Sequence, residues 1–294
     1  MNKRIRIGGE LARAVLIGLA SASREVLMLL ILTLALLMFG AAQADALHPH
    51  EDDSVDDLVR AAQNPVSTMI SLPFQNNMQR LENGATLNSL LIQPVIPFRI
   101  NEDWNLITRT ILPVVALSAP PNGVQRWALG DIQQSYFFSP NEFSNAGQVW
   151  GAGPIVSYPT ASSKAYGSGK LGLGPSFVGV QFSGPWVFGG LLNNIWSVAG
   201  DSDRNTVSQM SFQPFINYNY SDGWFVQSAP LITADWKATG GNKWTVPVGG
   251  GGGRTFRLGN QPVTSILTAF YNVERPDGGP KWNVRFQMTF MFPR

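Results

Sequence analysis

The chain has 294 residues, of which 44% are hydrophobic and 14% charged, and it contains no cysteine. Without thiols it can form neither a disulfide framework nor a cysteine metal site. Its formal net charge of +2 originates in the first 44 residues, which carry five Lys or Arg and two Asp or Glu. The remainder has 16 basic and 17 acidic residues, so its net charge of −1 excludes nucleic acid as a natural partner.

The N-terminus has the organisation of a secretory signal peptide. Basic residues precede the apolar run 26–39, and Ala42-Gln43-Ala44 follows as a small-x-small cleavage site before Asp45. A retained membrane anchor is the alternative. The apolar run is, however, shorter than the roughly 20 residues that a spanning helix needs. We therefore expect cleavage, which places the mature protein outside the cytoplasm.

The next segment, residues 45–65, is polar and predicts a short helix. Asp53 or Ser54 can cap the helix, and Pro65 ends it. A segment of this length, tethered before the first strand, can fold back as a plug. The alternative is an idle tail, because chain termini are commonly disordered.

From residue 67 onward, strand patterns alternate with turn residues. The last one is the clearest, because large apolar side chains occupy every second position from Trp282 to Phe292. Roughly ten residues of alternation are typical of a strand that crosses a bilayer. The sequence predicts about twelve such strands, an even number as in bacterial barrels. They lie near 67–77, 86–100, 104–117, 127–138, 148–158, 171–183, 186–199, 206–220, 224–236, 243–257, 262–273 and 282–292.

The links between these strands alternate in length, which is the asymmetry of outer-membrane barrels with short periplasmic turns. Both termini then lie on the periplasmic side. Link 139–147 is an exception, because it is long although it falls on the side of the short turns. The short links are 101–103, 183–185, 221–223 and 259–261. The long links are 118–126, 160–170, 200–205, 237–242 and 274–279.

Two sets of residues are expected on opposite faces of the wall. Five tryptophans at strand starts predict an aromatic girdle on the lipid side: Trp104, Trp186, Trp224, Trp244 and Trp282. Six polar residues are candidates for lining the lumen: Arg109, Gln209, Gln213, Asn217, Arg285 and Gln287. Polar side chains also fill barrels that pass nothing, and about twelve strands predict a narrow or plugged lumen rather than a wide pore.

Three features leave the strand pattern open in places. Strand 104–117 is apolar in both phases, so its facing is undetermined. The glycine run 249–253 predicts either a kink in the wall or a lateral gap. Five prolines inside strands predict bulges near the rims: Pro94, Pro113, Pro214, Pro230 and Pro247.

Several motifs of the chain recur in one bacterial family. They are Ala62-Gln63-Asn64-Pro65-Val66, Pro73-Phe74-Gln75-Asn76-Asn77, Gln93-Pro94-Val95-Ile96-Pro97-Phe98, Glu102-Asp103-Trp104-Asn105-Leu106-Ile107-Thr108-Arg109-Thr110, Gly184-Pro185-Trp186, Asn193-Asn194-Ile195-Trp196 and Gln213-Pro214-Phe215-Ile216-Asn217-Tyr218-Asn219. The chain resembles the outer-membrane transporter-like proteins often mislabelled neuromedin U, and the "MetA-pathway of phenol degradation" barrels. The resemblance implies an outer-membrane barrel that takes up small molecules, aromatic ones among them. It carries over no catalytic or binding residue.

The residue inventory argues against catalysis and against a metal site. The two histidines, His48 and His50, both precede the first strand, so no histidine can serve as a base inside the barrel. Their neighbours Glu51 and Asp52 could complete a metal site, but two imidazoles in a terminal segment are weak evidence. We expect no catalytic residue, no metal and no cofactor.

The sequence thus predicts an all-β transmembrane antiparallel barrel in the outer membrane of a Gram-negative cell. Its predicted parts are a signal peptide (1–44), a periplasmic segment (45–65) and the barrel (66–294). The expected function is passive transport of small molecules, hydrophobic or aromatic. The alternatives are a structural protein with a closed lumen and, third, a barrel enzyme. The expected partners are outer-membrane lipid, the barrel-assembly machinery and a small solute.

Signal cleavage is directly testable. We expect the protein recovered from the outer-membrane fraction to begin at Asp45, because cleavage follows Ala42-Gln43-Ala44. N-terminal sequencing is the measurement. Recovery of a chain that still contains the apolar run 26–39 would contradict the prediction.

Overall fold

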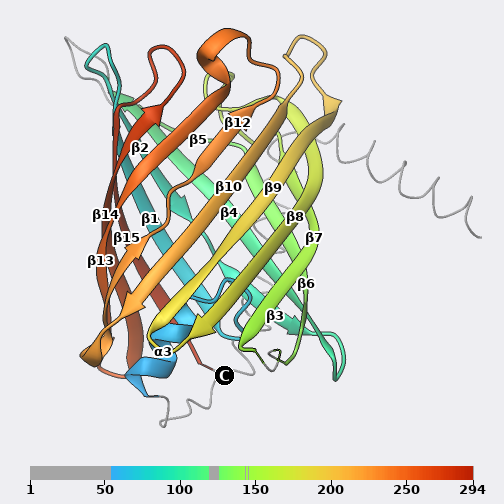
Figure 1. Ribbon diagram of the computed structural model, residues 1–294. Coiled ribbons are helices and arrows are strands. Elements are labelled where there is room, and N and C mark those ends of the chain that lie inside the picture. Colours follow the sequence, from blue (N-terminus) through green and yellow to red (C-terminus); the bar gives the residue numbers. More distant parts are fainter. Residues whose placement is uncertain (1–53, 119–125, 143, 145, 294) are drawn as a thin grey trace, which may run out of the picture.

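The protein is a closed antiparallel β-barrel (Figure 1). The computed structural model describes residues 54–118, 126–142, 144 and 146–293. Fifteen strand segments form one sheet, and β1 pairs with both β2 and β15, so the sheet has no free edge. The segments are β1 (Ile70–Arg80), β2 (Thr86–Ile92), β3 (Val95–Arg99), β4 (Trp104–Ser118), β5 (Arg126–Leu129), β6 (Ile132–Pro140), β7 (Gln148–Tyr158), β8 (Lys170–Ser183), β9 (Trp186–Gly200), β10 (Ser208–Asn219), β11 (Trp224–Ser228), β12 (Ile232–Asp235), β13 (Trp244–Leu258), β14 (Gln261–Glu274) and β15 (Trp282–Phe292).

Three pairs of segments each occupy a single position in the wall. β2 and β3 both pair with β4, as do β5 and β6, and both β11 and β12 pair with β10. Fifteen segments therefore make twelve wall strands, which confirms the predicted fold class and strand number.

The breaks inside the three composite strands have a partly local cause. Two contain a proline, Pro94 and Pro230, whose nitrogen cannot donate a ladder hydrogen bond. Both breaks lie midway along the wall, so the prediction that such irregularities occur near the rims is wrong for these two prolines. Pro247 adjoins a register shift at the start of β13, whereas Pro113 and Pro214 stay within β4 and β10, paired with Leu91 and Gly190.

The first strand begins later than the sequence predicted, at Ile70 rather than residue 67. Local hydrogen bonds hold the preceding residues in turns. The side chain of Asn64 accepts from the Val66 nitrogen at 3.1 Å, and that of Ser67 accepts from the Met69 nitrogen at 3.1 Å. These side-chain to backbone bonds compete with strand pairing until the ladder with β15 starts.

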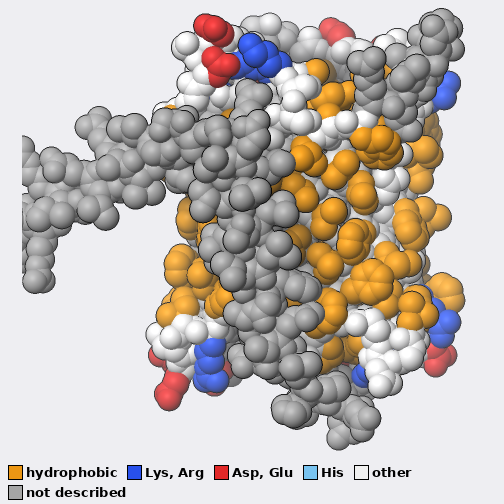
Figure 2. Space-filling model, turned by 180° about the vertical axis from the view of Figure 1, so that it is seen from behind, with side chains coloured by type: hydrophobic (Ala, Val, Ile, Leu, Met, Phe, Trp, Pro, Cys, Tyr) orange, Lys and Arg blue, Asp and Glu red, His pale blue; other side chains and the backbone are white. Residues whose placement is uncertain are grey.

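The outer surface is a hydrophobic band with charged residues at both ends (Figure 2). Strand β15 shows how the alternation produces it: Phe286 is 43% exposed on the outside, whereas its neighbour Arg285 is 7% exposed inside. Such a band around a closed barrel belongs in a bilayer, and the protein is an outer-membrane barrel. Within the described ranges no helix has the length and hydropathy to span a membrane.

One end of the barrel is covered by the helix α3 (Val55–Ala62). Ser54 caps it by accepting from the Asp57 nitrogen at 3.2 Å, and Leu58 and Val59 are buried. The helix contacts β13, β14 and the short 3-10 helix η1 (Ser221–Gly223). The other 3-10 helix, η2 (Gly240–Lys243), lies in a link at the opposite end. The α3 end carries the shorter turns, which is the arrangement expected at the periplasmic end of such a barrel. The predicted signal peptide lies outside the described residues.

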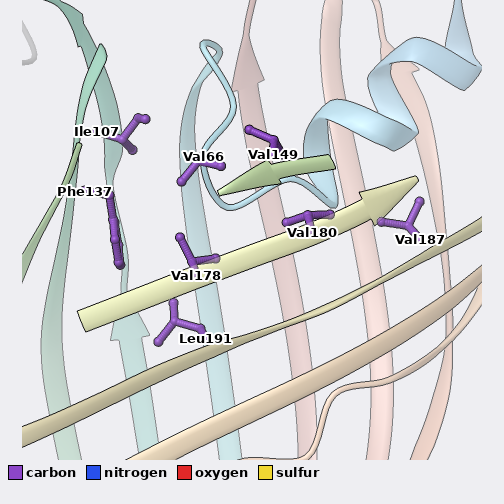
Figure 3. Close-up of a cluster of buried hydrophobic side chains, with 8 residues drawn as sticks. All are labelled: Val66, Ile107, Phe137, Val149, Val178, Val180, Val187 and Leu191. Carbon is purple, nitrogen blue, oxygen red and sulfur yellow. The ribbon is translucent and has the colours of Figure 1, made fainter. Parts of the chain in front are cut away.

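A cluster of apolar side chains fills one side of the lumen near this end (Figure 3). Val66, from the segment after α3, packs there against inward side chains of β4, β6, β7, β8 and β9. The cluster consists of Val66, Ile107, Phe137, Val149, Val178, Val180, Val187 and Leu191. It explains why strand 104–117 is apolar in both phases, since Ile107 points into an apolar part of the lumen.

The glycine run in β13 allows a close approach of neighbouring backbones. A Cβ at Gly251 would lie 2.0 Å from the Leu267 oxygen of β14, and one at Gly249 would lie 2.1 Å from the Ala269 oxygen. On the other side, the pairing of β13 passes from β12 to β11 between Thr245 and Gly251. The run therefore tightens the contact with β14 while the opposite ladder is interrupted.

Arginine substitution tests the two faces of β15. Phe286→Arg or Met288→Arg should destabilise the barrel by about 2–4 kcal/mol near the midplane, since each would place a charge in lipid. Gln287→Arg, the matched neighbour, should cost much less. Unfolding in lipid vesicles by denaturant measures the difference in stability. Equal costs at the three positions would contradict the assignment of Phe286 and Met288 to the lipid face.

Candidate functional site

The lumen contains three cavities arranged between the periplasmic segment and the outer loops. The inner cavity, about 180 Å³, lies between residues 61–69 and the wall. The middle cavity is about 550 Å³, and the outer cavity, beneath the external loops, is about 600 Å³. The middle cavity shares Arg109 and Arg285 with the inner one and Gln209 and Asp235 with the outer one. The three cavities thus follow one another along the barrel.

A hydrogen-bonded layer separates the inner and middle cavities, and we call it the polar belt. It consists of Gln75, Asn77, Gln93, Arg109, Gln213, Arg285 and the carbonyl of Ala229.

One half of the polar belt connects the two arginines through side chains. Nη2 of Arg109 donates to Oε1 of Gln93 at 2.5 Å, and Nε2 of Gln93 donates to Oε1 of Gln75 at 3.4 Å. Nε2 of Gln75 then donates to Oδ1 of Asn77 at 3.3 Å, which also accepts from Nε of Arg285 at 3.1 Å. These side-chain acceptors hold both guanidinium groups in place, and Oδ1 of Asn77 is shared between Gln75 and Arg285.

The other half uses a backbone oxygen that the break between β11 and β12 exposes. The Ala229 carbonyl accepts from Nη1 of Arg285 at 3.0 Å and from Nε2 of Gln213 at 3.3 Å. Gln93 likewise lies in the break between β2 and β3. Each break is an X-Pro pair, Gln93-Pro94 or Ala229-Pro230, where the proline nitrogen cannot donate a ladder hydrogen bond. The belt uses the side chain of Gln93 and the backbone oxygen of Ala229.

The structure distributes the six candidate lumen residues over three levels. Arg109, Gln213 and Arg285 meet in the polar belt and border both the inner and middle cavities. Asn217 and Gln287 border the inner cavity, and Gln209 borders the middle and outer ones.

Sequence reasoning missed Gln75, Asn77, Gln93 and the Ala229 carbonyl. The prolines after Gln93 and Ala229 were the available signal, because a proline within a strand marks a place where the ladder fails. Gln75 and Asn77 belong to β1, for which the sequence analysis assigned no lumen face. The apolar cluster was also missed, since only polar residues were expected inside.

Charge is unevenly distributed along the lumen. The outer cavity is bordered by Asp131, Asp203, Arg204 and Asp235, so carboxylates outnumber cations there. Of the described residues bordering the inner cavity, Arg109 and Arg285 are the charged ones, and both are cationic. The charge bordering the lumen therefore changes from mixed at the outer cavity to positive at the inner one.

Hydrogen bonds tie the external link 159–169 to the wall. Asp131, in the break between β5 and β6, accepts from the Ser168 nitrogen at 2.6 Å and from the Ala161 nitrogen at 3.1 Å. Arg204 donates to the carbonyls of Lys164, Gly167 and Ser168. A second tie joins two other external links, where Arg275 pairs with Glu82 and holds the pKa of that exposed carboxyl below its usual value.

The five candidate girdle residues lie on the outside at two levels. Trp104, Trp186 and Trp224 are exposed at the α3 end, and Trp282 is exposed at the opposite end. Trp244 is half-buried there and meets Trp236 edge-on at 5.6 Å. Their anchoring at a lipid interface stays a prediction.

Within the described ranges, no group of three or more His, Asp or Glu side chains is arranged to hold a metal ion. His48 and His50, the candidates weighed above, lie outside those ranges.

No known family profile and no curated protein matches this sequence. Among solved structures, the barrel is similar to the COG4313 outer membrane channel from Pseudomonas putida F1 (TM-score 0.57, 15% identity, covering 83% of this chain and 98% of that one). Weaker likenesses include the NanC porin (0.47, 9%, covering 76% and 100%) and the CymD monoaromatic hydrocarbon channel (0.40, 10%, covering 80% and 92%). The likeness to the COG4313 channel shows a shared fold, and at that level it confirms the predicted resemblance to outer-membrane barrels of the transporter type.

The role of Asp131 can be tested on whole cells. Asp131→Ala removes charge-assisted hydrogen bonds of about 1.5–3 kcal/mol each, so link 159–169 should open more often. External trypsin should then cut after Lys164 about tenfold faster or more. Asp103→Ala, in a periplasmic turn, is the control. Equal cleavage rates in the parent and Asp131→Ala would show that the aspartate does not hold the loop.

Proposed function

We propose that the protein is a passive outer-membrane channel for small molecules, gated or narrowed by its own N-terminal segment. The observation that carries the proposal is the succession of three cavities that share lining residues from the outer loops to the inner end. A barrel packed only for stability has no need of such a series, since voids lose contact energy.

The N-terminal segment is held at the inner end by polar contacts as well as by Val66. Arg60 donates to the Gly184 carbonyl at 2.8 Å. Gln63 exchanges two side-chain hydrogen bonds with Asn219, at 2.8 and 3.2 Å. These contacts join one short segment to the turn between β8 and β9 and to the end of β10, as a plug requires.

The lining favours small solutes with an apolar part. Leu191, Phe215, Phe225, Ile266 and Met291 border the inner cavity beside the polar belt. A site with apolar walls and a few fixed polar groups orients a small ligand rather than passing everything below a size limit. Transport rather than catalysis also agrees with the channels and porins that share the fold. Outer-membrane lipid and the barrel-assembly machinery are the partners that such a barrel requires.

A closed structural barrel is the second candidate, and the apolar cluster favours it. Val66, Phe137 and Leu191 fill part of the lumen near the periplasmic end. The two candidates differ in solute flux, so liposome swelling in small amino acids with apolar side chains decides between them. Swelling above that of empty liposomes supports the channel, and swelling equal to theirs supports the closed barrel.

Removal of the plug should increase conductance. Deleting residues 45–65 behind an intact signal peptide removes α3 and its contacts with Gly184 and Asn219, so the inner end should widen. Planar-bilayer recordings should show a higher single-channel conductance than the parent. The double variant Leu58→Asn, Val59→Asn, which unseats the helix without shortening the chain, should act in the same direction.

Asp56→Asn is the matched control, because Asp56 is exposed on the same helix and should leave conductance unchanged. A deletion variant that assembles normally and remains as poorly conducting as the parent would contradict the plug. If neither protein conducts, the channel itself is contradicted.

A further inference from the structure

We infer that the inner cavity is a binding site for a small organic carboxylate with an apolar body. The inference rests on the proposed function in that the solute reaches the site through the lumen. It names the class of solute that the polar belt would select, which the channel proposal leaves open.

The first support is the charge of the two arginines that border the cavity. Each hydrogen bond that they make to a described residue goes to a neutral oxygen, of Gln93, Asn77 or Ala229. The ion pair found among the described residues, Arg275–Glu82, lies in external links. Arg285 is buried and Arg109 is half-buried. Cations inside a membrane protein without a carboxylate partner are costly, and such groups mark solute pathways. An anionic solute would supply the missing charge.

The second support is the set of donors that remains. Nε and Nη1 of Arg285 and Nη2 of Arg109 donate these hydrogen bonds, so each guanidinium keeps N–H groups without an acceptor among the described residues. Thr268 is the cross-strand neighbour of Arg285 and borders the same cavity. Its hydroxyl is buried, with the residue 3% exposed, and makes no hydrogen bond within the described ranges. A carboxylate could accept from these groups together.

The third support concerns the rest of the ligand. Phe215, Phe225 and Ile266 border the cavity and form an apolar part of its wall. Apart from Arg109 and Arg285, the described lining residues are uncharged. Carboxylates at the outer cavity would repel an anion weakly in a solvated vestibule, whereas the two arginines make the field at the inner cavity positive. The cavity of about 180 Å³ limits the ligand to a small molecule.

Equilibrium dialysis of the detergent-solubilised mature protein tests this site without requiring conduction. The probe is labelled benzoate, and benzamide is its neutral counterpart of the same shape. Benzoate should bind saturably and benzamide should not. Unlabelled hexanoate should displace benzoate, and phosphate at the same concentration should displace it much less, because phosphate has no apolar part. Displacement by phosphate as strong as by hexanoate would overturn the organic class.

Variants then locate the site. Arg109→Gln, Arg285→Gln and Thr268→Val should each weaken benzoate binding, the arginine variants by about tenfold or more. Arg285→Lys keeps the charge but loses the planar fork, so it should bind better than Arg285→Gln and less well than the parent. Arg254→Gln is the control, since Arg254 is exposed and stacks over Trp224 at 5.1 Å on the outside. Because Arg285→Gln could assemble poorly, Arg109→Gln and Thr268→Val test the site independently.

The inference is overturned if benzoate fails to bind saturably, if benzamide binds equally well, or if the Arg109 and Thr268 variants bind like the parent. Bilayer recordings of the same preparations separate this result from the channel proposal. Binding that depends on the arginines in a protein that does not conduct supports the site and contradicts the channel. Conduction without benzoate binding supports the channel and contradicts the site.

Discussion

The antiparallel pairing of β1 with β15 is the constraint on which the rest of the structure depends. It runs through eleven residue pairs, from Ile70 with Phe292 to Arg80 with Trp282, and it leaves the sheet without an edge. In hydrocarbon an unpaired backbone group costs several kcal/mol, so a sheet can cross the membrane only when it closes. Closure also creates the lumen, and it fixes which alternate side chains of β1 and β15 face it.

The same requirement explains why the irregular positions of the wall carry the candidate site. At Pro94 and Pro230 the proline nitrogen cannot donate a ladder hydrogen bond. The Ala229 carbonyl at one break accepts from Arg285, and the side chain of Gln93 at the other break accepts from Arg109. The polar belt thus joins the two breaks and lies between the inner and middle cavities.

The fold could be predicted from the sequence because its signals are local and repeated. Alternation in β15 and the alternating link lengths required no knowledge of distant contacts, and they led to the correct class and strand number. The arrangement of the interior was harder to predict from the sequence. The start of β1 depends on turns around Asn64 and Ser67, and the apolar cluster depends on Val66 packing against β6 and β8 far along the chain. Net charge was also uninformative, since a chain near neutrality places two arginines and no carboxylate among the described residues around its inner cavity.

The central claim is that solvent and solute have access to the polar side of the wall and not to its outer band. The natural absence of cysteine makes the test direct. Single cysteines at Gln287 and at the adjacent Met288 are treated in liposomes with a charged, membrane-impermeant thiol reagent. The account predicts that Gln287→Cys, at the inner cavity, is modified and that Met288→Cys, on the lipid face, is protected. Equal modification of the two, or modification of Met288→Cys alone, would contradict it.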